Sequence, residues 1–292
     1  NEPDLSDGRD ELNLAEFPLT TLSDRPQPEL DRLTFSDVVY DSGDAGRPVN
    51  RTLTVTPAAG LGLPTPTDGD VLLALVQLTR WANGFTDRRT DFSRYQIVKL
   101  LRWPDSGASY ERVEQSLNRW MGVTLFFDRA WWDRRQRAWV NEKFHLLDRV
   151  SLRASRDGTS SFTWGEVPFN SFRAENIKRL DLQAYFDLQL PSSRRLYRFL
   201  DKRFHQREAV SFDLRTLACE HVGFSRDCPN AELKRRMAPA VAELERSAYV
   251  EAAPADERFV SPHHGQWRVF FRRRETPAPA DGLAAELVRR GV

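Results

Sequence analysis

Cysteine and long apolar runs are scarce in this chain of 292 residues. The two cysteines, Cys219 and Cys228, lie nine positions apart without a matching Cys/His pair, and this is no zinc-binding spacing. We therefore expect a reduced, cytoplasmic environment, with Cys219 in the core. The sequence contains no run of about 18 apolar residues that would cross a bilayer, and no secretory signal at its N-terminus. Membrane attachment and secretion are not expected.

Motifs of two enzyme classes are missing as well. The sequence has no GxxxxGK[ST] phosphate loop, which is the motif that many ATP-driven proteins use to bind the phosphates of ATP. A DNA-nicking enzyme would need alternating histidines that share one cation, together with a tyrosine nucleophile. His263 and His264 are adjacent instead, and neighbours on a strand point to opposite faces. We expect no enzyme activity, no catalytic residue, no metal site and no cofactor.

An excess of charge of one sign is also missing, because 43 Lys and Arg stand against 42 Asp and Glu. The charges are unevenly spread. Residues 1–46 hold 3 Arg against 12 acids, residues 88–153 hold 14 Lys and Arg against 8 acids, and residues 258–274 hold 5 Arg and no acid. Phosphate binding depends on local charge, so the two basic regions are compatible with nucleic-acid binding. The acidic segment either screens a basic surface or contacts a neighbouring subunit, and a solvated flexible tail is the alternative for its first ten residues.

A globular composition, with 40% hydrophobic and 29% charged residues, suits one large domain or two ordinary ones at this length. The first half predicts three helices. The first runs through residues 71–78 after a cap at Asp68 or Asp70, and the second follows a cap at Ser93 and ends at Pro104. The third is the most strongly patterned.

This third helix has Ser109 as its expected N-cap and Gly122 as a left-handed end. Its expected apolar stripe is formed by Val113, Leu117, Trp120 and Met121. Its opposite face carries polar or long side chains of the kind that reach base edges, namely Arg112, Gln115, Ser116 and Arg119. A solvated helix face is the alternative interpretation of this stretch taken alone.

Two β-rich runs follow, on either side of the polar turn at residues 133–137. They predict a hairpin with a cationic tip formed by Arg134, Arg135 and Arg137. Three helices followed by a basic hairpin is the order of a winged helix, a helix-turn-helix variant whose second motif helix enters the major groove. An ordinary soluble turn is the alternative interpretation of the tip.

The same order is predicted again in the second half. A helix from Pro191 precedes a short strand at residues 210–212, a helix that ends at Gly223 and a third helix that Pro239 should kink. Two β-runs follow, around residues 249–250 and at residues 266–273. The exposed side of the third helix offers Asn230, Lys234, Arg235 and Arg236.

The predicted fold class is therefore α+β, with tandem winged-helix domains and β-hairpin wings. We expect an acidic N-terminal segment (1–66) with β-strands that pack on the first domain, a first winged-helix domain (67–180) and a second (181–275). Residues 276–292 read as a Pro/Ala linker and the start of another helix, so the natural chain is expected to continue.

Three motifs resemble the bacterial plasmid replication initiators of the RepA/TrfA-like type (replication initiator protein A). They are RDELNLAEFPLTTLSDR at residues 9–25, RRLYRFLDKRF at residues 194–204 and LKRRMAPAVAELE at residues 233–245. The resemblance covers residues 9–274. It implies two winged-helix domains that bind repeated origin sequences (iterons) in double-stranded DNA. It also implies contacts with host replication proteins such as the host initiator, helicase or clamp, and no catalytic activity.

The resemblance places Arg112, Gln115, Ser116 and Arg119 in the first recognition helix, and Asn230, Lys234 and Arg235 in the second. Self-association as a dimer through the N-terminal segment and the β-surface of the first domain is also expected. A winged-helix transcriptional repressor without a replication role is the alternative function. The complete set of expected DNA-binding residues is Ser109, Tyr110, Arg112, Gln115, Ser116, Arg119, Arg134, Arg135, Arg137, Asn230, Lys234, Arg235, Arg272, Arg273 and Arg274.

Overall fold

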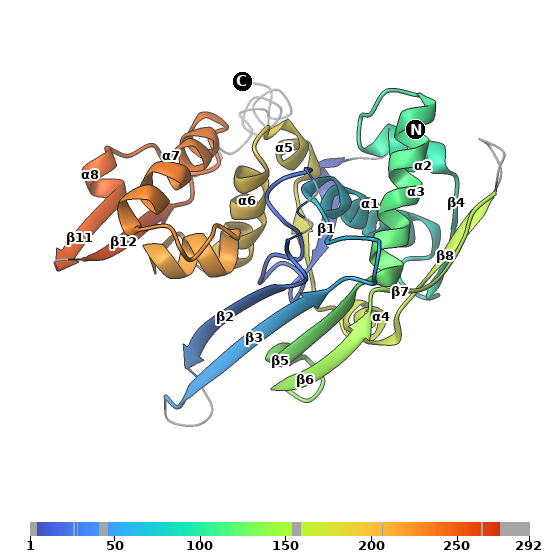
Figure 1. Cartoon of the computed structure of the whole chain (residues 1–292), viewed down its shortest axis with the longest axis horizontal. Helices are drawn as coiled ribbons and strands as arrows, with labels where there is room; N and C mark the ends of the chain where they lie inside the picture. The colour runs from blue at the N-terminus through green and yellow to red at the C-terminus, as the bar shows by residue number, and fades with distance from the viewer. Residues whose placement is uncertain are drawn as a thin grey trace, which may run out of the picture.

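The computed structural model describes residues 5–25, 27, 29–40, 46–153, 159–205, 207–263 and 265–274. Two groups of helices and short strands lie on either side of the N-terminal segment, and a larger sheet extends below them (Figure 1). Buried side chains of both groups and of the N-terminal segment form one continuous hydrophobic core. The predicted linker and helix at residues 276–292 lie outside the described residues, as does His264.

The first group, which we call the first unit, combines three helices with a three-stranded antiparallel sheet. Its elements are α1 (Pro66–Asn83), β4 (Arg89–Phe92), α2 (Arg94–Leu100), α3 (Gly107–Gly122), β7 (Leu147–Ser151) and β8 (Ser160–Trp164). The sheet order is β4-β8-β7, so the strand between α1 and α2 pairs with the second strand of the later hairpin. The three helices predicted for this half are confirmed.

Capping side chains determine where the first two helices begin. Thr65 and Asp68 form a capping box at α1, in which the backbone N–H of Thr65 donates to the Asp68 carboxylate over 2.7 Å. The cap predicted at Asp68 or Asp70 was therefore placed too late, because Pro66 already occupies the first helical turn. At α2 the predicted cap is confirmed: the Ser93 hydroxyl accepts from a backbone N–H in the first turn.

Helix α3 begins and ends differently from the prediction. Ser106 is its N-cap instead of Ser109, and the Ser106 hydroxyl accepts the N–H of Ser109 over 3.3 Å. Gly122 is not left-handed, because the chain passes directly into extended backbone at Val123. A Cβ at Gly122 would lie 2.5 Å from Leu61 Cδ1. Gly122 therefore packs closely against the Leu61 side chain and does not form a left-handed turn.

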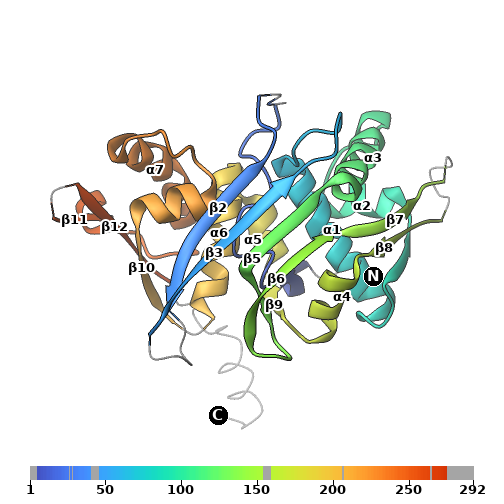
Figure 2. The same cartoon turned by 60° about the horizontal axis from the view of Figure 1, so that its bottom comes forward.

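Four strands form the large sheet, in the order β2 (Leu33–Tyr40), β3 (Pro48–Thr56), β5 (Thr124–Asp133) and β6 (Ala138–His145). Figure 2 shows this sheet across the front of the molecule. The β5–β6 hairpin was predicted to follow α3 as a wing, but β5 pairs with β3 at residues 52–56. The hairpin that completes the sheet of the first unit is β7–β8. The alternating pattern of β5 and β6 predicts a strand pair but not the sheet that the pair joins.

Short elements connect these parts. They are η1 (Leu5–Asp7), β1 (Gly8–Glu11), α4 (Glu166–Arg173), β9 (Ile177–Leu180) and α5 (Leu182–Asp187). Strand β1 pairs with β9, so the beginning of the chain lies beside the connection between its two halves. The domain limits at residues 66, 180 and 275 stay predictions.

The second group, called the second unit, repeats the organisation of the first. Its elements are α6 (Pro191–Phe204), β10 (Ala209–Asp213), the π-helix η2 (Thr216–Val222), α7 (Asn230–Arg246), α8 (Ala255–Arg258), β11 (Phe259–His263) and β12 (Gln266–Arg272). The sheet order is β10-β12-β11. In both units the strand after the first helix therefore pairs with the last strand of the unit.

Details of the second unit confirm some predictions and correct others. Gly223 ends η2 where the sequence predicted, with φ 106° in the left-handed region, and Cys219 is buried in the core as expected. The β-run predicted around residues 249–250 was wrong, because Val250 makes only an isolated bridge and the first strand of the hairpin is β11. Helix α7 continues through Pro239. In the described part of the chain, no helix is long and apolar enough to cross a bilayer.

Candidate nucleic-acid interface

The solvent face of α3 carries two of the predicted DNA-binding side chains. Arg112 and Gln115 are exposed. The Arg112 guanidinium lies 5.1 Å from the centroid of the Trp103 ring, and Gln115 Nε2 donates to the Glu111 carboxylate over 3.2 Å. This face therefore presents hydrogen-bonding groups next to a carboxylate, so its charge is mixed.

Two serines predicted to lie on that face are buried. Ser109 is 4% exposed and Ser116 is 0% exposed, so neither side chain can reach a base. Helix α3 packs against α1, α2 and β7, and these neighbours cover a wider arc than the single apolar stripe that the sequence predicted. In contrast Met121, which was predicted to belong to this stripe, is 36% exposed.

Arg119 and Tyr110 are engaged within the protein. Arg119 donates to the buried Asp68 carboxylate over 3.0 Å and to the Leu61 carbonyl over 3.3 Å. The Tyr110 hydroxyl donates to Asp105 over 2.7 Å. Arg119 therefore ties α3 to the start of α1. It was predicted to point toward DNA, but its guanidinium is directed at Asp68 and Leu61 instead.

The tip of the β5–β6 hairpin presents the three predicted arginines to solvent. Arg134 donates to the backbone carbonyl of Glu175. Arg135 and Arg137 form no ion pair within the part of the chain that the structure describes. Two of the three guanidiniums are therefore available to an external anion, although they belong to the large sheet.

The β7–β8 hairpin of the first unit carries basic residues that the sequence analysis did not select. Arg149 and Arg153 are exposed on this hairpin, and the turn at residues 154–158 lies outside the described residues. The signal that could have identified this strand pair is the alternation in Ser160–Trp164, where every second residue is buried.

Two half-buried residues near the N-terminal end of α7 contact other parts of the second unit. Asn230 Oδ1 accepts from Arg215 Nε over 3.1 Å, and its Nδ2 donates to the carbonyl of Gly265 over 2.9 Å. Lys234 Nζ lies over the Trp267 ring, 4.5 Å from its centroid. Asn230 and Lys234 thus connect α7 to the β11–β12 hairpin.

Arg235 and Arg236 point away from the core of the second unit. Their side chains are 78% and 49% exposed, and both pair with Glu232 at 2.7 Å. An ion pair at this exposure is weak, so it yields readily to a phosphate or a base. These arginines are therefore accessible cations near the N-terminal end of α7.

The arginines at the end of β12 do not lie at the tip of their hairpin. The turn between β11 and β12 is near Gly265, whereas Arg272, Arg273 and Arg274 lie at the other end of β12. Arg272 Nε is 3.5 Å from the Glu251 carboxylate. These three expected DNA-binding residues therefore lie at the end of the hairpin that is away from its turn, and their role in DNA binding stays a prediction.

A network of buried charges joins the N-terminal segment to α6. Three basic residues at helical spacing contact the segment, namely Arg195, Arg198 and Lys202. Arg198 binds both carboxylate oxygens of Asp10, at 2.7 and 2.9 Å. Arg195 donates to two backbone carbonyls and Lys202 to a third, over 2.7 to 2.9 Å. One face of α6 is therefore dedicated to the beginning of the chain.

Glu16 is the centre of this network. Its side chain is 1% exposed, it lies 2.8 Å from Arg51, and it also pairs with Lys202 and Arg203. Burial by itself would raise the pKa of Glu16, but the three cations hold it well below its ordinary value. Glu16 thus stays ionised in the interior and connects β3 to α6.

Asp37 and His221 extend the network toward η2. The His221 ring stacks between two phenylalanine rings, and its Nε2 is 3.4 Å from the Asp37 carboxylate. Oxygens or nitrogens of Glu16, Asp37 and His221 lie within 4.8 Å of one another, as in a small metal site. Arg51, however, bonds both carboxylates, so the acceptor atoms that a metal would need are already used by a guanidinium.

A further buried carboxyl lies where α1 meets α5 and α6. Asp70 accepts from the Tyr185 hydroxyl over 2.7 Å and from Arg194 over 2.6 Å. Burial raises the pKa of Asp70 to about 6, against the opposing charge of Arg194. The contact between the first unit and α6 therefore contains a carboxyl that titrates close to neutral pH.

None of the three interpretations of the acidic N-terminal segment describes Asp10, Glu11 and Glu16, which are all at most 1% exposed. The missed signal was a match between two distant motifs. The acids of residues 9–25 are interspersed among Leu and Phe residues, and the RRLYRFLDKRF run repeats basic residues on one helix face. Either motif alone looks like a solvated charged surface.

Comparison with known proteins adds a family and a fold. The model of the family described as replication initiator protein A matches residues 9–237. No curated protein matches the chain.

Two crystal structures of domains 2 and 3 of RctB match the chain. One is 17% identical, with a TM-score of 0.52, and covers 91% of this chain and 99% of that one. The other is also 17% identical, with a TM-score of 0.47 and coverages of 86% and 94%. At this identity the first likeness concerns the fold alone.

Proposed function

We propose that this chain, which belongs to the replication initiator protein A family, binds repeated origin sequences (iterons) of a plasmid as duplex DNA and thereby starts origin opening. The observation that carries the proposal is the repeated organisation of the two units. In each unit a helix, a strand and two further helices precede a two-stranded hairpin, and in each sheet the first strand pairs with the last. The β5–β6 hairpin intervenes before the hairpin of the first unit, and the short helix α8 intervenes in the second. A winged-helix module has this order of helices and hairpin.

In this proposal α3 and α7 are the recognition helices. Each enters a major groove, where Arg112 and Gln115 from α3 and Arg235 from α7 contact base edges. The β7–β8 hairpin takes the place of the first wing, and the β11–β12 hairpin takes the place of the second. Arginines near these hairpins, and those at the β5–β6 tip, hold phosphates. Two different units in one chain favour a long, asymmetric binding site.

The remaining expectations belong to the same proposal. The protein acts without catalysis of its own and needs neither metal nor cofactor. It works on DNA in the bacterial cytoplasm, associates with a second copy through the N-terminal segment and the large sheet, and contacts host replication proteins.

A transcriptional repressor built from the same units is the second candidate. Exposed basic residues on a recognition helix favour both roles equally, because both roles require reading duplex DNA. The two differ in one assay: a plasmid that carries the origin repeats and this gene is maintained if the protein is an initiator. Binding to the repeats without plasmid maintenance would favour the repressor.

The first test compares two arginines of one helix. Replacing Arg112 or Gln115 with alanine should cost about 1–3 kcal/mol on the cognate repeat and much less on random DNA, because these side chains face solvent. Arg119→Ala is the matched control, because Arg119 is tied to Asp68. It should lower the free energy of unfolding without changing sequence preference. Equal losses on both DNAs for Arg112→Ala would assign that residue to phosphate contact, against this proposal.

The second test asks which hairpin holds phosphates. Neutralising Arg149 and Arg153 together should flatten the salt dependence of binding by up to about 0.9 slope units for each lost phosphate contact. The matched pair Arg135 and Arg137, on the β5–β6 tip, is neutralised in parallel. Binding isotherms at increasing salt give both slopes. If the variant with Arg149 and Arg153 neutralised kept the salt dependence of the original protein, the β7–β8 hairpin would point away from DNA.

A further inference from the structure

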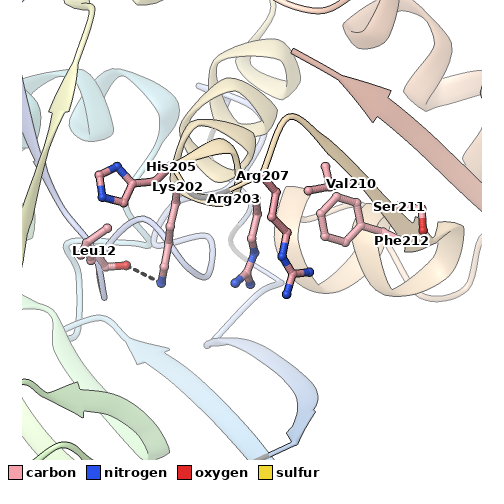
Figure 3. Close-up of a pocket in the computed structure, with 8 residues that line it drawn as sticks. All are labelled: Leu12, Lys202, Arg203, His205, Arg207, Val210, Ser211 and Phe212. Atoms are coloured by element: carbon pink, nitrogen blue, oxygen red, sulfur yellow. Dashed lines mark hydrogen bonds between the residues drawn. The ribbon is translucent and has the colours of Figure 1, made fainter. Parts of the chain in front are cut away.

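A basic cavity opens where α6 ends, between this helix, β10 and the N-terminal segment. Its volume is about 430 Å³, and its lining includes Lys202, Arg203, His205 and Arg207 but no acidic side chain. Figure 3 shows the cationic ends of Lys202, Arg203 and Arg207 next to one another and pointing the same way. Like charges in such a row repel unless an anion lies among them.

The charges behind the cavity do not cancel this row. Glu16 and Asp37 are the two carboxylates that pair there, against the cations Arg51, Lys202 and Arg203. Arg207 adds a further positive charge and forms no ion pair with any residue that the structure describes. The cluster therefore keeps an excess of positive charge that faces the cavity.

Hydrogen-bond donors are also left over. Arg203 uses one terminal nitrogen for Glu16, while its Nε is buried without a hydrogen-bond partner in the described part of the chain. Arg203 and Arg207 offer guanidinium groups, whose forked donors fit the oxygens of a phosphate.

We propose that this cavity binds a nucleotide through its phosphate. The cations alone would suit an inorganic anion, but the volume is within the range of small-molecule sites and far exceeds one phosphate. Val210 and Phe212 line the cavity beside the basic side chains. Such apolar and aromatic groups give a sugar and a base a surface on which to pack.

This site is separate from the surfaces that we propose for reading duplex DNA. Residues of the N-terminal segment, α6, β10 and the turn between the last two line it, and none comes from α3, α7 or the hairpins. The inference therefore goes beyond the proposed function. The phosphate has two sources, a free nucleotide or the backbone of a DNA strand outside the recognition grooves.

Calorimetric titration of the whole protein tests the proposal with inorganic phosphate, deoxyadenosine, deoxyadenosine monophosphate and a short single-stranded oligonucleotide. Deoxyadenosine monophosphate should bind more tightly than phosphate, and deoxyadenosine should not bind. Arg207→Gln should weaken nucleotide binding by about tenfold or more, since a charged hydrogen bond is lost. The control Arg173→Gln changes an exposed arginine of α4 outside the cavity and should bind normally. Arg207 is exposed, so unfolding of the variant should match that of the original protein.

The outcomes separate the two sources. If the oligonucleotide binds more tightly than the nucleotide, and Arg207→Gln loses this binding, the natural ligand of the cavity is a DNA strand. If the nucleotide binds more tightly, the natural ligand is a free nucleotide. Equal affinities of Arg207→Gln and the original protein would overturn the proposal, as would binding of a hexaglutamate peptide that the nucleotide does not displace. Recognition of origin repeats is measured on the same samples, so failure of the cavity and failure of the proposed function are distinguishable.

Discussion

Replacing Glu16 with alanine is expected to lower the free energy of unfolding by about 3–5 kcal/mol, the loss typical of breaking a buried ion pair. The reason is the number of cations that depend on this one carboxylate. Arg51, itself 1% exposed, would keep only Asp37, and Lys202 and Arg203 would lose their buried partner. Urea unfolding of the whole chain measures the change. Glu29→Ala, at an exposed acid of the same segment, is the control and should change little.

The pH dependence gives a second measure of the same effect. Because the pKa of Glu16 is lowered in the folded protein, its contribution is present above the pKa of the unfolded chain, near 4.5, and is lost as the pH falls through the lower folded value. Glu16→Ala should therefore lose most stability at neutral pH and differ least in strong acid. A loss as small as that of the control would show that the cations are solvated and that the network contributes little.

Charge reversal on α7 is expected to weaken binding to a complete origin repeat by about 10²–10⁴-fold. In Arg235→Glu with Arg236→Glu, the second unit would be repelled by DNA, and only the first unit would hold the duplex. Two linked units gain an affinity of this size because docking of one confines the search of the other. A footprint should show protection lost over one half of the repeat and kept over the other.

Arg246→Glu, at the exposed last turn of the same helix, is the matched control and should keep the whole footprint. If the double variant bound as tightly as the original protein, the second unit would serve another purpose, such as contact with a partner protein. The repressor function with a single reading unit would then be favoured.

Local signals in the sequence predicted most of the elements. The cap at Ser93, the helix end at Gly223 and the periodic core residues of α3 depend on neighbours a few positions away, so one chain segment contains the whole signal. The motifs at residues 9–25, 194–204 and 233–245 likewise pointed to the family that matches residues 9–237.

Features that depend on distant partners were predicted less well. The β5–β6 pair was recognised, but its pairing with β3, about 70 residues earlier, was not. Ser116 was predicted to be exposed, but it is buried. The periodicity of a single helix shows which residues share a face, but it does not show how many neighbouring elements cover that helix. The buried acids were missed for the same reason, since their counter-ions lie on α6. Residue type alone gives no indication that a charge has a distant partner.

The network around Glu16 also constrains the order in which this protein can fold during synthesis. Glu16 leaves the ribosome before its partners, because Lys202, Arg203 and His221 are made only after more than 180 further residues. Domains generally fold as units, N-terminal first, while the rest of a chain is still being translated. Here the beginning of the chain must wait, with its acids hydrated, until α6 and η2 have emerged. The two halves of the molecule therefore complete their folding together.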